Sequence, residues 1–430
     1  MKVTGRIIRY SLILFVVLES LLLFHHSVRL EIRISRRHHQ PQLTTLDRIV
    51  TTTENSSREQ NASLINHQLI ITQSSPLVTL KYPSQHCKDA PVGKVAYIRT
   101  HKTGSTTLTH IVNQYGLLRN LSFCLPKSGS LGRYMIYNVT KAKPKMSLLK
   151  PLNSSSFNES FPRFSMFTLH TLYDRQGMEK VMEPNSRYIT SVRDPVKQFR
   201  SAFVYYGFEN GFPDEIKKEL KSRPIAEKLK EWFRNATSYQ QTYKLKNMRG
   251  EPRYYYTRNS QINDLGYNMK YIDDKAKISK YISKLAREFD VVLITEHFDE
   301  SLLLMKKELC WDIEDILYFP KNIRFKKSEP LPPEIQTSIR EWNFADLQLF
   351  EHFNRTLWTK IRRHGPSFET ELIEFKSYLK ELGRRCGGEK QVVLKIARPV
   401  ERNVTIDCHV LKCGEGEMFE KLRKRQYRKQ

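Results

Sequence analysis

Lys102 and Gly104 lie in a short polar turn between two patterned segments. The apolar run 95–98 favours a buried strand, and the spacing of apolar residues from Leu108 onwards favours a helix. Such a turn presents free backbone N–H groups and the positive end of a helix dipole to an anion. Gly104 would let the backbone approach that anion closely, and Lys102 would add a positive charge. We therefore expect a site for the 5′ end of a nucleotide. The hydroxyl residues expected to bind the anion or cap the helix are Thr100, Thr103, Ser105, Thr106 and Thr107.

This turn differs from the phosphate-binding loop of nucleoside triphosphatases. That pattern places four residues between its first glycine and a Gly-Lys-Ser/Thr triplet, whereas here Lys102 precedes the single glycine. The order found here does not require magnesium, and we expect no metal site. A lumenal nucleoside-phosphate kinase is disfavoured for the same reason. An ordinary strand-to-helix connection remains the simplest alternative to an anion site.

A second strand-like run ends at Val192 and is followed at once by Arg193, Asp194 and Pro195. Pro195 suits the first turn of a helix, where its missing N–H costs nothing. Arg193 could bind a phosphate through two parallel hydrogen bonds, and Ser201, about two turns into the helix, could add a hydroxyl contact. A surface arginine and an ordinary helix serine are the alternative.

Together, the two segments resemble the 5′-phosphosulfate and 3′-phosphate binding motifs of sulfotransferases that use 3′-phosphoadenosine 5′-phosphosulfate (PAPS). The resemblance is closest to the Golgi galactose-3-O-sulfotransferase family, which includes the galactosylceramide-specific enzymes. It is most specific in residues 100–107 and in the block 296–319. It implies a P-loop-like parallel α/β sheet flanked by helices, PAPS as donor co-substrate, and a galactose-terminated glycolipid or glycan as acceptor.

The same resemblance suggests roles for individual residues. Lys102 would stabilise charge on the leaving phosphate, without a metal. His170, at the end of an expected strand over 165–170, matches a family histidine and is the expected base. A strand-end histidine held by the backbone is the alternative. His101 is the rival base, and it joins Asn259 and Asp264 as an expected acceptor contact.

The chain ends outside this region have simpler patterns. Residues 1–10 form a short basic arm, and residues 11–28 are the expected transmembrane segment. The apolar run Ser11–Phe24 just reaches the length of a spanning helix when Ile7 and Ile8 are included. No small-residue cleavage site follows it, so we expect an uncleaved signal anchor, with a cleaved signal peptide as the alternative. Residues 29–86 are expected to be a lumenal stem, 87–365 a catalytic domain, and 366–430 an extension of unclear role.

Sequons and cysteines point to the secretory lumen, and the family resemblance, together with the expected anchor, implies a type II membrane protein of the Golgi. The formal charge of +27 suits an anionic ligand, and lumenal targeting counts against nucleic acid. Six cysteines without CxxC spacing predict structural disulfides, although spacing does not fix the pairing. Asn-X-Ser/Thr sequons begin at residues 55, 61, 120, 138, 153, 158, 235, 354 and 403.

Two functional alternatives to transfer onto galactose O-3 stay open. One is a sulfotransferase that acts on glycosaminoglycans, and the other is a non-catalytic protein that binds glycans.

Alternating short strands and helices predict a parallel sheet covered on both faces. The oligomeric state is unknown. Expected strands are 95–99, 165–170, 188–192 and 291–295; expected helices are 105–115, 174–182, 196–206, 225–234, 276–288, 301–309 and 334–353.

Overall fold

The computed structural model describes residues 90–126, 148–152, 163–246, 253–319, 329–397 and 399–428. All of them belong to the second of two units, Ser74–Gln430. The expected arm, signal anchor and stem lie outside the described residues. Among the helices that are described, none combines the length and the apolar character needed to cross a bilayer.

Four parallel strands form the central sheet, in the order β2-β1-β3-β4. Their bounds are Val95–Ile98 for β1, Met166–Phe167 for β2, Arg187–Val192 for β3 and Val291–Ile294 for β4. All four are buried along almost their whole length, which explains why they are apolar throughout rather than alternating. The predicted α/β class with a parallel sheet is confirmed.

The strand order places a topological switch point between β1 and β3. From β1 the chain crosses to β2 on one side, and from β2 it crosses back to β3 on the other side of β1. Ile98 is paired with Thr190, so the two central strands end side by side. In open α/β sheets, ligands bind at the carboxyl ends of the strands that flank such a point.

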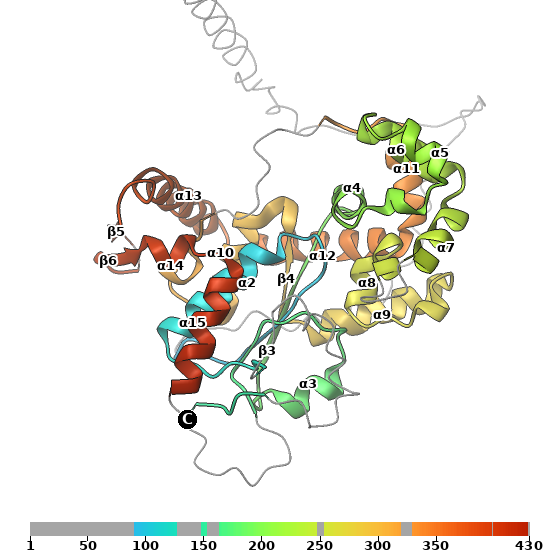
Figure 1. Ribbon diagram of the computed structural model, residues 1–430. Helices are drawn as coiled ribbons and strands as arrows, with labels where there is room; N and C mark the ends of the chain where they lie inside the picture. Colours follow the sequence, from blue (N-terminus) through green and yellow to red (C-terminus); the bar gives the residue numbers. More distant parts are fainter. Residues whose placement is uncertain are drawn as a thin grey trace, which may run out of the picture. The chain divides into compact units, whose positions relative to one another are not determined.

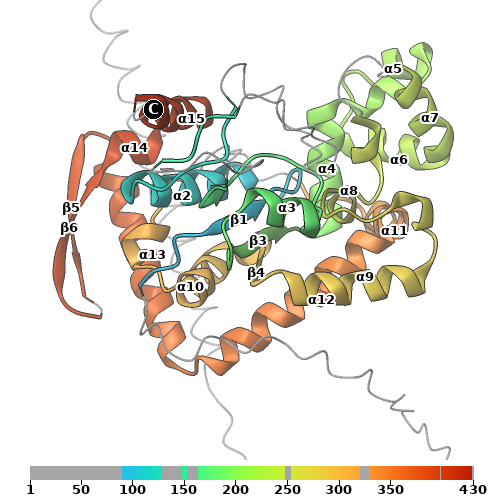
Figure 2. The ribbon, with the colours of Figure 1, turned by 90° about the horizontal axis from the view of Figure 1, so that it is seen from below.

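Helices cover both faces of this sheet. Helix α2 (Ser105–Leu118) lies on one face, whereas α10 (Phe298–Leu309) and α12 (Phe344–Arg363) lie on the other (Figures 1 and 2). Strands and helices share one large buried core. That core holds the ends of β1 and β3, and the loops that follow them, on a rigid base.

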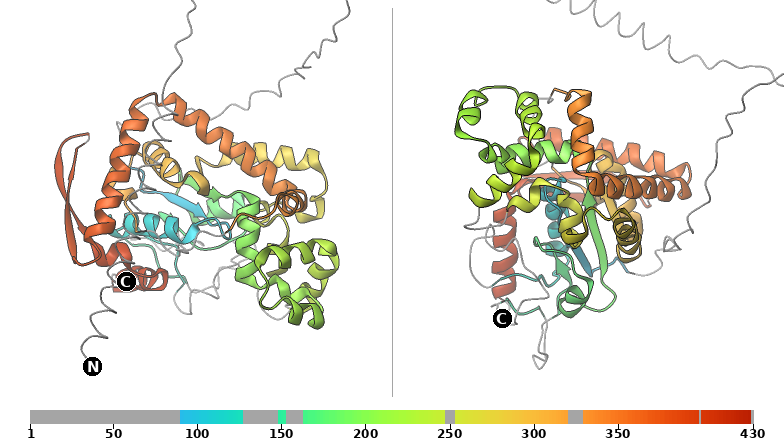
Figure 3. Two further views of the ribbon diagram at one scale, coloured as in Figure 1. Left: turned by 90° about the horizontal axis from the view of Figure 1, so that it is seen from above. Right: turned by 90° about the vertical axis from the view of Figure 1, so that its right-hand side faces the viewer.

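A second buried cluster lies beside α4 (Pro195–Tyr206), and Trp232 is at its centre. Phe199 and Phe203 of α4 contact the Trp232 ring at centroid distances of 6.5 and 5.7 Å. Figure 3 shows the helices coloured green, which are α4 and those that follow it in the chain, gathered on one side of the sheet. The helices that contribute to this cluster besides α4 are α6 (Ile225–Arg234), α7 (Ala236–Lys246) and α11 (Pro333–Trp342).

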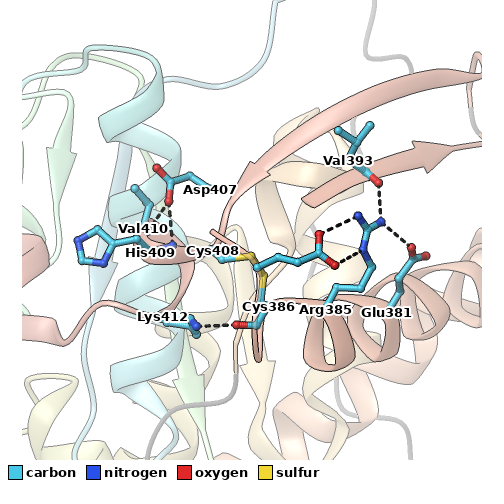
Figure 4. The surroundings of a disulfide bond; sticks show 10 residues. Glu381, Arg385, Cys386, Val393, Asp407, Cys408, His409, Val410 and Lys412 are labelled. Carbon is cyan, nitrogen blue, oxygen red and sulfur yellow. Dashed lines mark hydrogen bonds and ion pairs between the residues drawn. A yellow bond between two sulfur atoms is a disulfide. The ribbon is translucent and has the colours of Figure 1, made fainter. Parts of the chain in front are cut away.

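The residues beyond 366 pack on the same core as the sheet. The hairpin β5 (Gln391–Ile396) and β6 (Arg402–Asp407) has one buried face, and a Cys386–Cys408 disulfide joins it to α13 (Ser367–Arg385) (Figure 4). Structural disulfides, as predicted, are therefore present, although Cys124 and Cys413 are buried thiols. The remaining helices are α3 (Arg175–Val181), α5 (Asp214–Glu219), α8 (Ser260–Asp264), α9 (Lys275–Glu288), α14 (Cys408–Lys412) and α15 (Glu415–Arg428).

Two expected elements differ from the structure by more than a shift of their ends. The strand expected over 165–170 spans only Met166–Phe167, so His170 lies three residues beyond it. The helix expected over 334–353 is two helices, because Asn343 leaves the helical conformation with φ −111° and ψ 40°. Apolar periodicity continues across this break and cannot detect it.

Candidate active site

The turn after β1, which we call the donor loop (Thr100–Gly104), is shaped by two left-handed residues. Lys102 has φ 64° and Gly104 has φ 75°. Gly104 is also the N-cap of α2, and no side chain caps this helix. Ser105, Thr106 and Thr107 lie inside the first turn, so the expectation that they cap α2 is wrong. The left-handed conformation of Gly104, which favours glycine, directs the chain into the helix.

Hydroxyl groups fix the donor loop to β3. The Oγ1 atoms of Thr100 and Thr103 are 2.7 Å apart, and both threonines are fully buried. Thr103 Oγ1 is also 3.0 Å from Ser191 Oγ, while Thr100 Oγ1 donates to the Ser191 carbonyl. From the end of β4, the Thr295 hydroxyl donates to the Thr103 carbonyl at 2.7 Å. The side chains of Thr100 and Thr103 therefore shape the loop, which leaves its backbone to face a ligand.

The start of α2 suits an anion. The N–H groups of a first helical turn have no carbonyl partner within the helix, and the dipole makes this end positive. The first turn of α2 contains no acidic residue. Lys102 places its Nζ 3.6 Å from the centre of the Tyr205 ring, beside this helix end. Thr106 is half-buried and Gly104 is exposed, so a ligand can reach both.

Arg193 joins the end of β3 to the donor loop. Its Nη1 donates to the Lys102 carbonyl at 3.1 Å, and its backbone exchanges two hydrogen bonds with the Gln261 side chain. Its Nε makes no hydrogen bond to any described residue and lies 3.8 Å from Glu296. Burial lowers the pKa of this guanidinium, but arginine stays charged. Arg193 thus ties the end of β3 to the donor loop and brings its positive charge there.

Helix α4 faces the donor loop with a stripe of residues spaced by four. Lys197 Nζ is 3.6 Å from Glu296 Oε1, and Tyr205 contacts Lys102. Ser201 is half-buried and lies between them on the same face. Asp194 caps this helix by accepting from the Lys197 N–H at 3.1 Å. The fold thus brings Lys102, Arg193 and Ser201 to one place.

The ring of His101, in the donor loop, stacks on the ring of His170, with ring centroids 4.3 Å apart. The Nδ1 of His101 is 2.9 Å from Asp264 Oδ2, and the same carboxylate accepts from the His101 backbone N–H at 2.7 Å. His170 is almost completely buried and donates to the Arg99 backbone carbonyl. Burial, followed by the charge of Arg99, holds the pKa of His170 well below its usual value. Its Nδ1 makes no hydrogen bond to a described residue.

Asn259 has a structural position. Its Oδ1 accepts from the N–H groups of Ala345 and Asp346, in the first turn of α12, at 3.0 and 3.1 Å. Its Nδ2 donates to the Trp342 carbonyl, and the residue is fully buried at φ 48°. These contacts occupy the amide, so the structure does not place Asn259 as an acceptor contact.

Other residues around the site carry no signal in their local sequence. Asp346 accepts from the Gln261 and Ile262 N–H groups at 3.0 and 2.8 Å and so fixes α8, which ends at Asp264. Burial raises the pKa of Asp346 to about 7. Gln198 donates to the His101 carbonyl at 3.1 Å. Because these partners lie 84 to 97 positions apart in the chain, only the fold reveals them. The described residues contain no cluster of three metal-ligating side chains.

The fold and the site define a class of protein. In this class, a parallel α/β sheet places the start of a helix and two positively charged side chains, here Lys102 and Arg193, at one switch point. Comparison with known proteins narrows this class. A family model described as galactose-3-O-sulfotransferase matches residues 41–403. The chain belongs to this family of enzymes.

Individual relatives give the same result. The chain is 29% identical to galactose-3-O-sulfotransferase 2 of Sus scrofa over 301 residues, which is 69% of each chain. It is 30% identical to galactosylceramide sulfotransferase of Mus musculus over 306 residues, or 70% of this chain and 66% of that one. Galactose-3-O-sulfotransferase 3 of Mus musculus is 28% identical over 71% of this chain and 65% of its own. The alignments thus span about two thirds of the relatives' lengths.

Proposed function

We propose that this protein transfers a sulfuryl group from PAPS to O-3 of a terminal galactose on a glycolipid or glycoprotein. Membership of the family supports the reaction class and the sugar. The observation that carries the proposal is the 3.1 Å hydrogen bond from Arg193 to the Lys102 carbonyl, because it joins the two strand ends at one site.

The residues present suit a doubly phosphorylated donor. Lys102 and Arg193 supply positive charge, the start of α2 supplies N–H groups without an acidic neighbour, and Gly104 leaves room for close approach. Ser201 adds a hydroxyl. When bound, PAPS would supply the sulfuryl group and its leaving group. We assign the 5′-phosphosulfate to the donor loop and the 3′-phosphate to Arg193 and Ser201.

Transfer forms a bond between the acceptor oxygen and sulfur, breaks the bond between sulfur and the phosphate oxygen, and releases the hydroxyl proton. Lys102 and the first-turn N–H groups of α2 hold the negative charge that develops on the phosphate oxygen. Because these groups are already in position, they stabilise the transition state without reorganising. The role of Lys102 requires its ammonium to move from the Tyr205 ring to the ligand, which four rotatable bonds allow.

The proton is taken by one of the two stacked histidines. His170 is the sequence-based choice, and its lowered pKa keeps the ring neutral and able to accept a proton. His101 is favoured by a specific contact, because Asp264 holds its Nδ1 and so directs Nε2 away as the proton acceptor. Single His101→Ala and His170→Ala variants test this directly. The variant with the greater loss of kcat, with the donor KM unchanged, identifies the base.

We also propose that residues 11–28 anchor the chain in the Golgi membrane, that residues 29–86 form a stem, and that the rest is lumenal. Exposed sequon asparagines at 120, 235 and 403, together with the Cys386–Cys408 disulfide, support a lumenal location. Digestion of intact microsomes with protease, followed by removal of N-glycans, tests it. Protection of a glycosylated fragment is expected, and cleavage without detergent would contradict it.

The enzymatic proposal is tested with radiolabelled PAPS and a panel of acceptors. The panel contains simple β-galactosides, galactosylceramide and desulfated glycosaminoglycans. We expect label on galactose O-3, and loss of label in the Lys102→Ala variant. Label on glycosaminoglycans alone would show that the acceptor is a glycosaminoglycan rather than a terminal galactose. No transfer to any acceptor would favour a non-catalytic glycan-binding protein.

A further inference from the structure

The C-terminal helix α15 lies outside the segment that identifies the family and yet contacts Arg99, the residue just before the donor loop. The family match ends at residue 403, whereas α15 spans Glu415–Arg428. It runs alongside α2, the helix whose first turn follows the donor loop (Figures 1 and 2). The sequence predicts only an extension of unclear role over residues 366–430.

One end of α15 is fixed to the carboxyl end of α2. Arg425 Nη1 donates to the carbonyls of Gly116 and Leu117 at 3.1 and 2.8 Å, so it caps α2. Gln426 is fully buried and exchanges hydrogen bonds of 2.8 and 2.9 Å with the backbone of Phe123. These contacts make α15 a fixed part of the fold.

The other end of α15 reaches the start of the donor loop. Glu415 Oε1 accepts from Arg99 Nη1 at 2.5 Å, and the Arg99 side chain is only 6% exposed. Arg99 is the last residue before Thr100. Glu415 also lines a small hollow together with Thr106, which is in the first turn of α2.

Arg99 in turn contacts the histidine pair. Its backbone carbonyl accepts a hydrogen bond from His170, which is stacked on His101. Its guanidinium lies close enough to His170 to disfavour the charged imidazole. Among the described residues, Glu415 is the carboxylate that pairs with this buried arginine. The Arg99 Nε makes no hydrogen bond to any of these residues.

We propose that Glu415 is a positioning residue for the active site: it pairs with Arg99 and so fixes the strand end against which His170 rests. This inference rests on the proposed sulfuryl transfer for its catalytic consequence. A buried arginine that loses its partner keeps an uncompensated charge, which costs more than replacing the whole pair by apolar groups. Without Glu415, Arg99 would move toward other acceptors and carry the His170 contact with it.

The charges around His170 set the direction of the pH effect. Arg99 and His101 face it directly, and Asp264 and Glu415 act through these two. Loss of the Glu415 charge leaves Arg99 unbalanced, which further disfavours a protonated imidazole. With His170 as the base, the acid limb of the pH–rate profile should therefore move to lower pH.

The experiment compares full-length Glu415→Gln with three other variants. Glu417→Gln is the matched control, because Glu417 lies on the same helix turn but pairs, among the described residues, with exposed His409 and half-buried Lys421. Glu415→Asp keeps the charge, and the double variant Arg99→Met with Glu415→Met removes both charges. Rates are measured at a temperature at which circular dichroism shows every variant folded.

We expect Glu415→Gln to lower kcat about tenfold, with the donor and acceptor KM nearly unchanged. The acid limb should shift as stated, and Glu415→Asp should recover part of the lost kcat. The double variant should have a higher kcat than Glu415→Gln. Wild-type kcat and pH profile in Glu415→Gln would overturn the proposal. So would a double variant no better than Glu415→Gln, because the loss would then not come from the unpaired charge.

Hydrogen exchange separates this inference from the proposed function. If the wild-type chain transfers no sulfate, the function fails, but exchange in the peptide 99–108 still reports how well the loop is fixed. Glu415→Gln should speed exchange in this peptide, and Glu417→Gln should not. Equal exchange in both variants would overturn the positioning role, whatever the activity.

Discussion

Arg193 and Lys102, 91 positions apart in the chain, are joined by a hydrogen bond from the Arg193 guanidinium to the Lys102 carbonyl. The contact exists because β1 and β3 are adjacent parallel strands that end in register. Each strand then turns into a helix that begins close to the shared edge. A single nucleotide at this edge can therefore contact both loops, which is what the proposed reaction requires.

Replacing Asp264 by Asn tests the orientation of His101. The amide cannot hold the Nδ1 proton as the carboxylate does, so the ring loses its fixed tautomer. We expect kcat to fall by about 10²–10³ with donor affinity unchanged. Asp273→Asn is the control, because Asp273 is exposed and pairs with Arg258, away from the histidines. Equal kcat in both variants would show that the His101–Asp264 contact serves the fold alone.

Asn259 should affect stability rather than acceptor binding. Asn259→Ala removes the contacts to the first turn of α12 and places alanine in a left-handed conformation. The free energy of unfolding should fall by about 2–4 kcal/mol. Urea titration measures this loss, with Asn268→Ala, an exposed cap, as a control of smaller effect. A raised acceptor KM without loss of stability would restore Asn259 as an acceptor contact.

The buried carboxyl of Asp346 predicts a pH-dependent stability. Its pKa is raised to about 7 by burial, so the folded protein holds a proton that the unfolded chain releases above about pH 4. The stability from this group is complete below that pH and is lost as pH rises to about 7. Between pH 5 and 8, wild type should therefore lose roughly 2–4 kcal/mol relative to Asp346→Asn. Urea titrations at both pH values test this, and a constant difference would contradict it.

The Cys386–Cys408 disulfide should stabilise the carboxyl-terminal hairpin. It closes a segment of 22 residues, which predicts about 3 kcal/mol from the restricted unfolded state. Cys386→Ala with Cys408→Ala should lower the Tm by several degrees. Wild type, but not this double variant, should lose stability when a reductant is added. Identical melting of both proteins with and without reductant would show that the bond contributes nothing.

Local sequence patterns predicted the sheet and the two strand-end loops, because buried parallel strands are continuous apolar runs and glycine and proline mark helix starts. The helix 225–234 has its predicted bounds. Contacts such as Glu415 to Arg99 join residues 316 positions apart and have no local pattern. Helix α15 was not predicted, because its buried face combines Met418, Phe419 and Leu422 with Gln426, a polar side chain whose backbone partner Phe123 lies 303 positions away. The break at Asn343 likewise depends on partners elsewhere in the chain.

Nucleotide binding by isothermal titration calorimetry tests the central claim most directly, using adenosine 3′,5′-bisphosphate and adenosine 5′-monophosphate. Lys102→Ala should weaken both nucleotides, whereas Arg193→Ala should raise the Kd of the bisphosphate about tenfold or more and leave the monophosphate unchanged. Arg187→Ala, at the opposite end of β3 and paired with Asp290, should bind both as wild type does. Wild-type affinity of Arg193→Ala for the bisphosphate would contradict the assignment of both strand ends to one nucleotide.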